Sequence, residues 1–270
     1  MTAFAQHFVF EFKTGLRNPN QLLLNYLFPL GFYALMGLVM TQINPGFAET
    51  MVPAMVVFAI MASTILGLPS PLVESREAGI FRSYKINGVP ALSILTIPML
   101  TTIFHVLITS AIIVLTGPAL FKGIAPIHWG AFALVALVTA FACGAFGALI
   151  GVISASSQAT VLWSQLIFLP SMLIGGLMLP LSLLPKAIRP FSALLPTAHA
   201  MQAFMGLAYD QTTTLNPIVS LGVLLASGVL AFGLAIYLFN WDSRNQARRG
   251  HPLMALLALA PFVVSIFLQS

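Results

Sequence analysis

The stretch Trp129–Ile153, WGAFALVALVTAFACGAFGALIGVI, contains no charged side chain and only one hydroxyl, that of Thr139. A helix that crosses the hydrocarbon core of a bilayer needs about 20 consecutive, predominantly apolar residues. The stretch is longer than that and has no proline to interrupt it. It therefore predicts a membrane-spanning α-helix over residues 129–153.

The composition of the whole chain agrees with this local pattern. Apolar residues make up 59% of 270 positions and charged residues 6%, with a mean hydropathy of +0.99. Soluble domains carry about a quarter charged residues, so a soluble surface is excluded. A chain of this length holds about six spans and leaves no room for a soluble catalytic domain. We predict an all-α polytopic membrane protein built on a six-helix transmembrane bundle.

The remaining apolar stretches place the other spans on either side of residues 129–153. They predict spans at about 21–40, 51–68, 91–116, 160–179 and 217–240, within one domain over 1–240. Residues 241–270 follow as a basic linker and a possible seventh span at 253–268, which is just short of the usual lower limit of length. We therefore leave six and seven spans both open.

Two segments are apolar but do not fit a span. In residues 3–18, Phe4, Phe8, Phe12 and Leu16 recur every fourth position with charged residues between them, which is typical of an amphipathic helix lying in the membrane interface. Residues 180–216 are interrupted by four prolines, so we expect a re-entrant hairpin of short helices that enters the outer leaflet.

The distribution of Lys and Arg predicts the orientation of the chain. Cytoplasmic segments of membrane proteins carry an excess of these residues. With a cytoplasmic N-terminus the inner side holds Lys13, Arg17, Arg76, Arg82, Lys85, Arg244, Arg248 and Arg249, and the outer side holds only Lys122, Lys186 and Arg189. This bias explains the net charge of +5 without a nucleic-acid partner. It also places the most polar segment, residues 72–88, in the cytoplasm.

Three motifs occur in order along the chain. The first is Leu16-Arg-Asn-Pro-Asn-Gln-Leu-Leu-Leu24, leading into Phe28-Pro29-Leu30. The second is Glu74-Ser-Arg-Glu-Ala-Gly79, followed by Arg82 and Gly88-Val-Pro90. The third is Pro170-Ser-Met-Leu-Ile-Gly-Gly-Leu-Met-Leu-Pro180, with Leu184-Pro185 and Leu195-Pro-Thr-Ala-His199 after it. In this order the chain resembles the permease family of type 2 ABC transporters, of the kind that exports drugs, natural products or lipids. The apolar tail after Arg249 departs from the pattern, because many members end soon after helix six.

The resemblance implies a division of labour between polypeptides. Two permease subunits, as a homodimer or a heterodimer, would work with two ABC ATPase subunits that bind ATP and Mg²⁺. The present chain contains no G-x-x-x-x-G-K-[ST] loop to cradle a nucleoside triphosphate. We therefore expect it to bind no cofactor, to have no catalytic or metal site, and to act in a bacterial inner membrane with its N-terminus in the cytoplasm.

The polar segment after helix two is the candidate contact with the ATPase. The resemblance carries Glu74, Glu77, Gly79 and Arg82 to the family's coupling region. Charged side chains there offer charge-assisted hydrogen bonds, including those of Arg76, and Ile80 and Phe81 offer apolar anchors. The alternative is an ordinary solvated loop that satisfies the positive-inside rule.

The resemblance also places helices one, two and five at the dimer axis, and the candidates for the substrate path there are Met55, Phe58, Gln165, Phe168 and Met172. Methionine and phenylalanine suit an adaptable apolar cavity, although the same residues also suit plain packing. His105 lies on a polar face with Thr101 and Thr109. An ionisable residue in a span is a functional candidate, but we favour a neutral histidine bonded across helices. Gly144, Gly147 and Gly151 predict close helix packing within the chain.

Two other classes of function compete with the exporter. A secondary carrier or channel usually needs a carboxylate inside the membrane, yet every Asp and Glu falls outside or at the end of a predicted span. An intramembrane enzyme would need a motif such as H-E-x-x-H or G-x-S-x-G, which the sequence lacks. Among exporters, a polysaccharide or an ion remains an alternative to a hydrophobic or amphipathic substrate.

Overall fold

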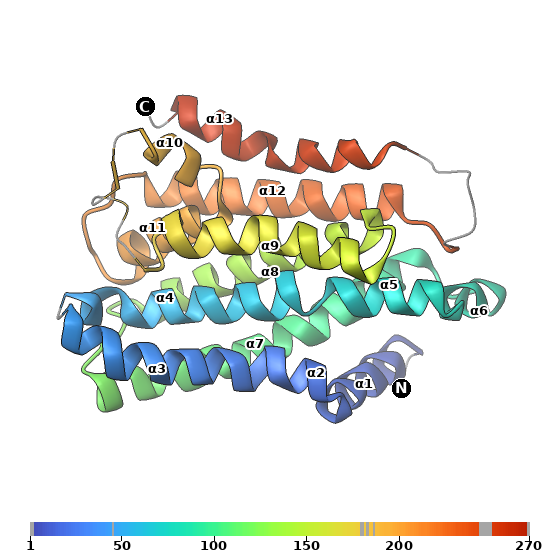
Figure 1. The fold of residues 1–270 in the computed structure, drawn as a ribbon, viewed down its shortest axis with the longest axis horizontal. Coiled ribbons are helices and arrows are strands. Elements are labelled where there is room, and N and C mark those ends of the chain that lie inside the picture. The colour runs from blue at the N-terminus through green and yellow to red at the C-terminus, as the bar shows by residue number, and fades with distance from the viewer. Residues whose placement is uncertain are drawn as a thin grey trace.

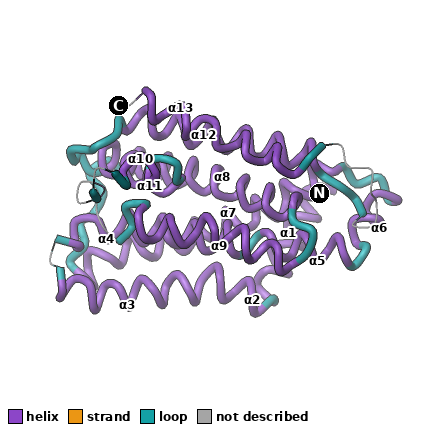
Figure 2. Tube along the Cα trace, turned by 45° about the horizontal axis from the view of Figure 1, so that its top comes forward, coloured by secondary structure: helices purple, strands orange, loops and turns teal. Residues whose placement is uncertain are grey.

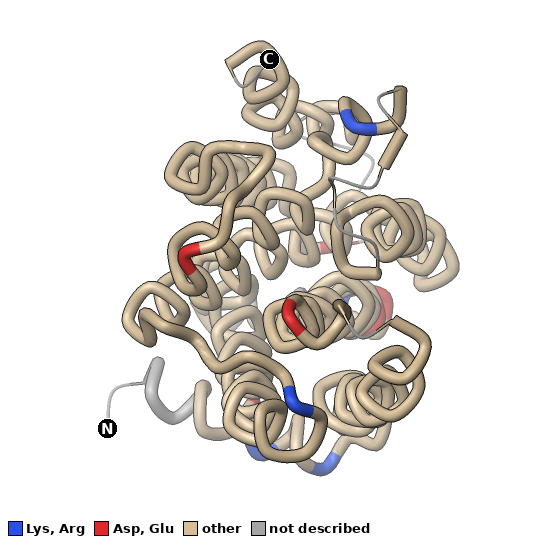
Figure 3. The backbone as a smooth tube through the Cα atoms, turned by 90° about the vertical axis from the view of Figure 1, so that its left-hand side faces the viewer, with Lys and Arg blue, Asp and Glu red and all other residues tan. Residues whose placement is uncertain are grey.

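The computed structural model describes residues 3–44, 46–178, 181, 184–185, 187–242 and 250–268, with side chains from Phe8 onward. All regular structure in these residues is helical. The long helices lie side by side along one direction and short helices gather at their two ends (Figures 1 and 2). Viewed along the helices, the spans pack around one another and charged residues are few (Figure 3).

The six predicted spans are all present as helices long and apolar enough to cross a membrane. They are Pro19–Ile43 (α2 Pro19–Leu22, η1 Leu23–Leu27, α3 Phe28–Ile43), Phe47–Glu77 (α4 Phe47–Met61, η2 Ala62–Leu66, α5 Pro69–Glu77), α7 (Ala91–Phe121), α8 (Trp129–Ile153), α9 (Ser157–Ile174) and α12 (Pro217–Leu238). The chain is a multi-pass membrane protein of all-helical fold.

The helical structure of the second span does not stop at Leu68, where the sequence predicts the span to end. Pro69 and Pro71 do not break this helix, because Pro69 stands in the first turn of α5, where a proline lacks no hydrogen bond that the helix needs. The π-helical segment η2, which ends at Leu66, precedes α5 and locally widens the helix before Pro69. The second span therefore continues as one column to Glu77.

Three other boundaries also differ from the predictions. The third span extends past residue 116 to Phe121, and the sixth ends at Leu238 rather than 240. The fifth begins at Ser157 and ends at Ile174, because Gly175 and Gly176 follow and Gly176 takes a positive φ of 86°. A left-handed residue of this kind is a common helix stop.

The second span is the centre of the bundle. In its most apolar window 89% of residues are buried, against 22% in α9 and 28% in the first span. It packs against α3, α7, α8 and α11. The first and fifth spans consequently keep one broad apolar face each for lipid or for another subunit.

The outer segment 180–216 contains two short helices, α10 (Arg189–Ser192) and α11 (Pro196–Ala208). Helix α11 packs between α8 and α12, and almost every residue of it is buried. Within it, the His199 Nε2 atom lies 2.9 Å from the Ala193 carbonyl oxygen and 3.3 Å from Ser265 Oγ. Residues 179, 180, 182, 183 and 186 of the predicted hairpin lie outside the described residues, and its entry into the outer leaflet stays a prediction.

A helical segment follows the sixth span in the C-terminal part of the chain. It consists of η4 (Pro252–Leu259), which is a 3₁₀ helix, and α13 (Ala260–Leu268). Both pack against α12, and Figure 1 shows them running back along most of its length. The predicted basic linker with Arg244, Arg248 and Arg249 lies in residues 243–249, outside the described residues.

One end of the bundle carries α1 (Ala3–Arg17), α5 and α6 (Ile80–Ile86), and the other carries α10 and α11 (Figure 1). Helix α1 packs against α7, and its position relative to the bilayer stays a prediction. Two of the segments predicted to be cytoplasmic, the N-terminal helix and residues 72–88, thus lie at the same end of the bundle. We refer to it as the α6 end.

Candidate functional site

At the α6 end, the second span exposes charged side chains of its last helix, α5. Glu74 and Glu77 lie on the last turns of α5, are exposed, and make no hydrogen bond or ion pair within the described residues. Gly79 then takes a φ of 76°, which turns the chain into α6. Two carboxylates are therefore presented to solvent from a helix end rather than from a free loop.

Arg76 belongs to the interior of the protein, contrary to the prediction of a solvent-facing segment. Its side chain is 7% exposed. The guanidinium donates to the Val152 carbonyl oxygen at 3.0 Å and also to the Ser154 carbonyl oxygen. These carbonyls end α8, where the helix dipole is negative. Arg76 thus ties α5 to α8 and is not available as a contact for a second protein.

Phe81 is also buried and fixes α6 against the last span. Its ring centroid lies 5.6 Å from that of Phe239, and the residue is 4% exposed, so the prediction of an apolar anchor for a partner is wrong for this side chain. The neighbouring Arg82 forms an ion pair with Asp242 while its side chain stays 56% exposed. Helix α6 is therefore held between the second and the sixth span.

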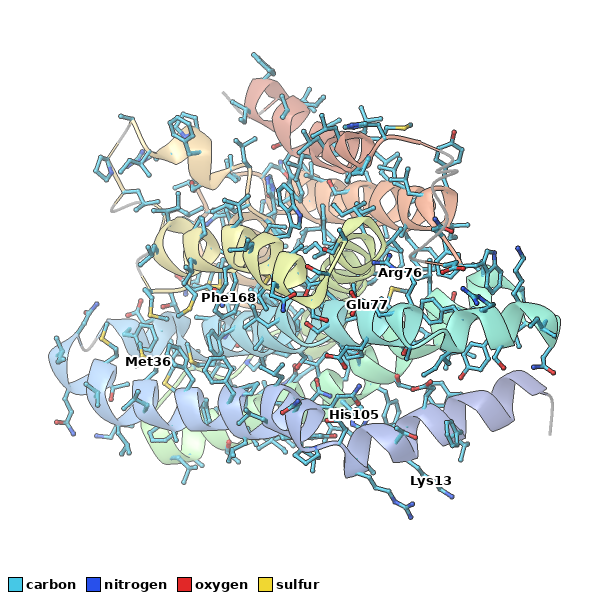
Figure 4. All side chains as sticks on the ribbon, turned by 45° about the vertical axis from the view of Figure 1, so that its right-hand side comes forward. Lys13, Met36, Arg76, Glu77, His105 and Phe168 are labelled. Carbon is cyan, nitrogen blue, oxygen red and sulfur yellow. The ribbon has the colours of Figure 1, made fainter. Side chains whose placement is uncertain are left out.

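These contacts narrow the predicted coupling site. From the exposed residues of this segment we select Glu74, Glu77, Ile80, Arg82 and Lys85, which we call the end surface. Figure 4 shows Arg76 turned into the bundle near Glu77. The role of the segment as the contact with the ATPase stays a prediction, and the sequence pattern does not tell its exposed carboxylates from the buried Arg76.

A cluster of four aromatic rings joins the first, second and fifth spans. Phe58 of α4 stacks on Phe32 with ring centroids 4.1 Å apart, and its centroid lies 5.4 Å from that of Phe28. Phe168 of α9 lies 5.8 Å from Phe58 on the other side. The sequence pointed to Phe58 and Phe168 but missed Phe28 and Phe32, whose spacing of four on one helix face is the signal that was available.

The other candidates for the path surround this cluster at different depths of burial. Met55 is fully buried in the core of the second span, and Met172 is partly buried against that core. The Gln165 Oε1 atom is buried without a hydrogen-bond partner among the described residues. Ser171 Oγ of the same helix is also buried without a partner there. An unpaired buried polar atom is unfavourable, so α9 carries two polar groups that a partner from outside this chain could satisfy.

His105 lies away from the aromatic cluster, under the N-terminal helix. Its Nδ1 atom is 2.7 Å from the Tyr26 hydroxyl, and its ring stacks on Phe12 at a centroid distance of 4.4 Å. Figure 4 shows it near the junction of α1 and α2, far from Phe168. Hydrogen bonding and stacking across helices are the contacts that we expect of a histidine with a structural role. They fasten α1 to α7.

Three of the four glycines of α8, Gly144, Gly147 and Gly151, allow close approach within the chain. A Cβ atom on Gly147 would lie 2.3 Å from the carbonyl oxygen of Thr64 in the second span, and one on Gly151 would lie 3.1 Å from that of Pro69. On Gly144 it would meet the Met99 side chain at 3.0 Å. Gly147 and Gly151 thus set the distance between α8 and the second span.

Comparison with known proteins finds a family that covers most of the chain. Residues 13–237 match the family model described as ABC-2 family transporter protein. The chain belongs to the ABC-2 transporter family. It is 24% identical over 203 residues to YvfS of Bacillus subtilis strain 168, whose name describes it as a transport permease, and the alignment covers 74% of this chain and 82% of that protein. No solved structure was found to be similar to the chain.

Membership of the ABC-2 family indicates what kind of protein carries the end surface and the aromatic cluster. The chain is the membrane component of an ABC transporter, and the family implies a separate ABC ATPase as its partner. The matched range includes the end surface, the four aromatic rings and the three glycines of α8. The segment η4–α13 lies beyond it.

Proposed function

We propose that the chain is the transport subunit of an ATP-driven exporter, which moves a hydrophobic or amphipathic molecule out of the cytoplasm or inner leaflet. Two copies, or one copy and a paralogue, would assemble with two ABC ATPase subunits in a bacterial inner membrane, with the N-terminus in the cytoplasm. ATP and Mg²⁺ would bind to the ATPase. The end surface would receive the motor, and the face with the aromatic cluster would form the path.

The observation that carries this proposal is the continuous column from Phe47 to Glu77. It contains 31 helical or near-helical residues, about 46 Å at 1.5 Å per residue. Glu77 stands at its exposed end and Phe58 in its middle. Because α5 is tied to α8 through Arg76 and to α6 through the Gly79 turn, a displacement of the end surface moves the whole column.

The chemistry of the cluster supports an apolar or amphipathic substrate. Phe28 is 36% exposed and brings the cluster to the surface of the bundle, whereas Phe58 and Phe168 are buried behind it. Aromatic rings bind apolar groups through area and polarisable faces. The Gln165 acceptor adds one polar contact at the same face of α9. A second copy of the chain placed against the open faces of the first and fifth spans would enclose this surface.

The proposal is tested by reversing the charge at one position of the end surface. We expect Glu77→Lys to insert in the membrane in normal amount but to lose binding of the ABC ATPase and ATP-dependent export of a fluorescent amphiphile. The variant removes a carboxylate that makes no contact inside the described residues, so the fold itself loses nothing. ATPase binding is measured by co-purification of the two subunits, and export by efflux from energised cells.

Glu49→Lys is the matched control. Glu49 is exposed in the first turn of α4, at the opposite end of the same column. It receives the same charge change without touching the end surface, so ATPase binding and efflux should persist. Undiminished efflux by Glu77→Lys, or an equal loss in both variants, would remove the assignment of the end surface.

A further inference from the structure

A cavity of about 390 Å³ lies at the α6 end, enclosed by α1, η1, α5, α6 and α7. It is distinct from the aromatic cluster, since none of the four rings lines it. One part of its wall is apolar, with Phe10, Leu72 and Ile94, and another part is polar, with Glu11, Asn25 and Glu74. A wall divided in this way suits a molecule with a polar head and an apolar tail.

Asn25 is the residue in this wall that the fold does not explain. It is 5% exposed and lies inside the first span. Its backbone carbonyl accepts a hydrogen bond of 2.7 Å from Thr109, but its side chain makes no hydrogen bond within the described residues. Neither amide atom of Asn25 is among the side-chain atoms that are closed off and unpaired. The amide is therefore open to the cavity that it lines, and a group that enters the cavity can form a hydrogen bond with it.

The local backbone is irregular on both sides of Asn25. The residue lies in η1, a π-helical segment, and Ser63 in the facing wall lies in η2, which is also π-helical. The two segments are in contact. Such π-helical turns are rare and occur frequently at functional sites. Here they widen two adjacent spans at the same level of the bundle.

The charge in the wall favours a cation. Glu11 comes from α1 and Glu74 from α5, whereas none of the described residues that line the cavity is Lys, Arg or His. Burial, together with the nearby Glu11 carboxylate, raises the pKa of Tyr84, which also lines the cavity. The negative potential therefore reaches inside the wall.

The cavity continues toward the fifth span. A second cavity of about 480 Å³ reaches Ser157, Gln158 and Val161 at the start of α9. Both cavities are lined by Asn18, Gln21, Gly67, Pro71 and Glu74. The two cavities are therefore neighbours, with Glu74 in the wall of both.

We propose that this cavity is an entry site for amphipathic molecules with a cationic ammonium head group. The Glu74 carboxylate attracts the head group, the Asn25 side chain accepts a hydrogen bond from it or orders its water, and the apolar wall holds the tail. The site refines the proposed function by naming the substrate class, and it rests on that function only for the direction of transport.

Photolabelling of the full chain in phosphatidylcholine nanodiscs, without ATPase or ATP, tests the site. The probe is a diazirine-bearing dodecylammonium, and the dodecyl phosphate of the same length is its anionic counterpart. We expect the ammonium probe to label peptides of α1, η1 and α5, and the phosphate probe not to do so. Asn25→Leu should raise the half-saturating concentration of the ammonium probe about tenfold, as expected for one lost hydrogen bond to a charged group.

Asn87→Leu serves as the matched control, because Asn87 is exposed and lies outside both cavities. Should Asn25→Leu fail to fold, Glu74→Gln, an exposed change of equal shape, must still abolish the preference for the ammonium probe. Equal labelling by both probes, or a Glu74→Gln protein that keeps the full preference, overturns the site. Since no ATPase is present, the outcome is independent of the Glu77→Lys test of the proposed function.

Discussion

Substitution of Gly147 by alanine tests the packing of α8 directly. The added Cβ atom would lie 2.3 Å from the Thr64 carbonyl oxygen. Real Cβ atoms essentially never approach another heavy atom closer than 3.0 Å, so α8 must move away from the second span by several tenths of an ångström. Overpacking of this kind costs about 1–3 kcal/mol.

The control for helix propensity is present in the same chain. Gly222 of α12 is exposed, and an added Cβ atom there would meet nothing within 4 Å. Alanine improves a helix by about 0.5–1 kcal/mol at either position. The difference between Gly147→Ala and Gly222→Ala therefore isolates the steric cost of about 1–3 kcal/mol. In a chain of this size that corresponds to a lower unfolding midpoint by roughly 2–12 °C.

The assay is thermal unfolding of the purified variants in one detergent, followed by tryptophan fluorescence. Gly144→Ala adds an internal ranking, because its neighbour is the flexible Met99 side chain rather than backbone. We expect the midpoint to fall most for Gly147→Ala, less for Gly144→Ala, and not at all for Gly222→Ala. A Gly147→Ala protein as stable as Gly222→Ala would refute the contact between α8 and the second span.

Two further predictions concern the buried arginine and the C-terminal segment. Arg76→Met removes two charge-assisted hydrogen bonds to the end of α8, so we expect it to lose about 3–5 kcal/mol of unfolding free energy. Arg76→Lys should have intermediate stability. An Arg76→Met protein that unfolds like the wild type would contradict the role of Arg76 in tying α5 to α8. The segment η4–α13 has eight 3₁₀ and nine α-helical residues, about 30 Å in total, which is enough to cross the bilayer core. We therefore expect Leu268→Cys to react with an impermeant maleimide from outside intact cells. Reaction only from the cytoplasmic side would exclude a seventh span.

The place of the candidate site in the chain follows from the local sequence, but the burial or exposure of its individual side chains does not. The motif Glu74 to Gly79 marks the segment after the second span because it is the most polar part of an apolar chain. Arg76 sits two residues from Glu74 and one from Glu77, and all three look equally hydrophilic. Only the approach of the α8 end, some 76 positions away in the chain, makes Arg76 a buried donor while both carboxylates stay outside.

The aromatic cluster shows the same limit. Phe58 and Phe168 were named as candidates because the family resemblance places their helices at the dimer axis. Their contact with each other and with Phe32 depends on how three spans rotate about their own axes. A chain so uniformly apolar gives little amphipathic contrast to fix that rotation, so the sequence could not exclude lipid-facing positions for these rings.

The sequence by itself determined the approximate places of the six spans, because the thickness of the bilayer core prescribes about 20 apolar residues for each. It did not determine where the second span ends or what surrounds Asn25. Those depend on tertiary contacts: the first turn of α5 accepts Pro69 once η2 shifts the helix register, and two π-helical segments must face each other before a polar cavity exists. The hydrophobic effect selects the membrane helices, whereas packing and hydrogen bonding between distant residues shape the surfaces by which the protein acts.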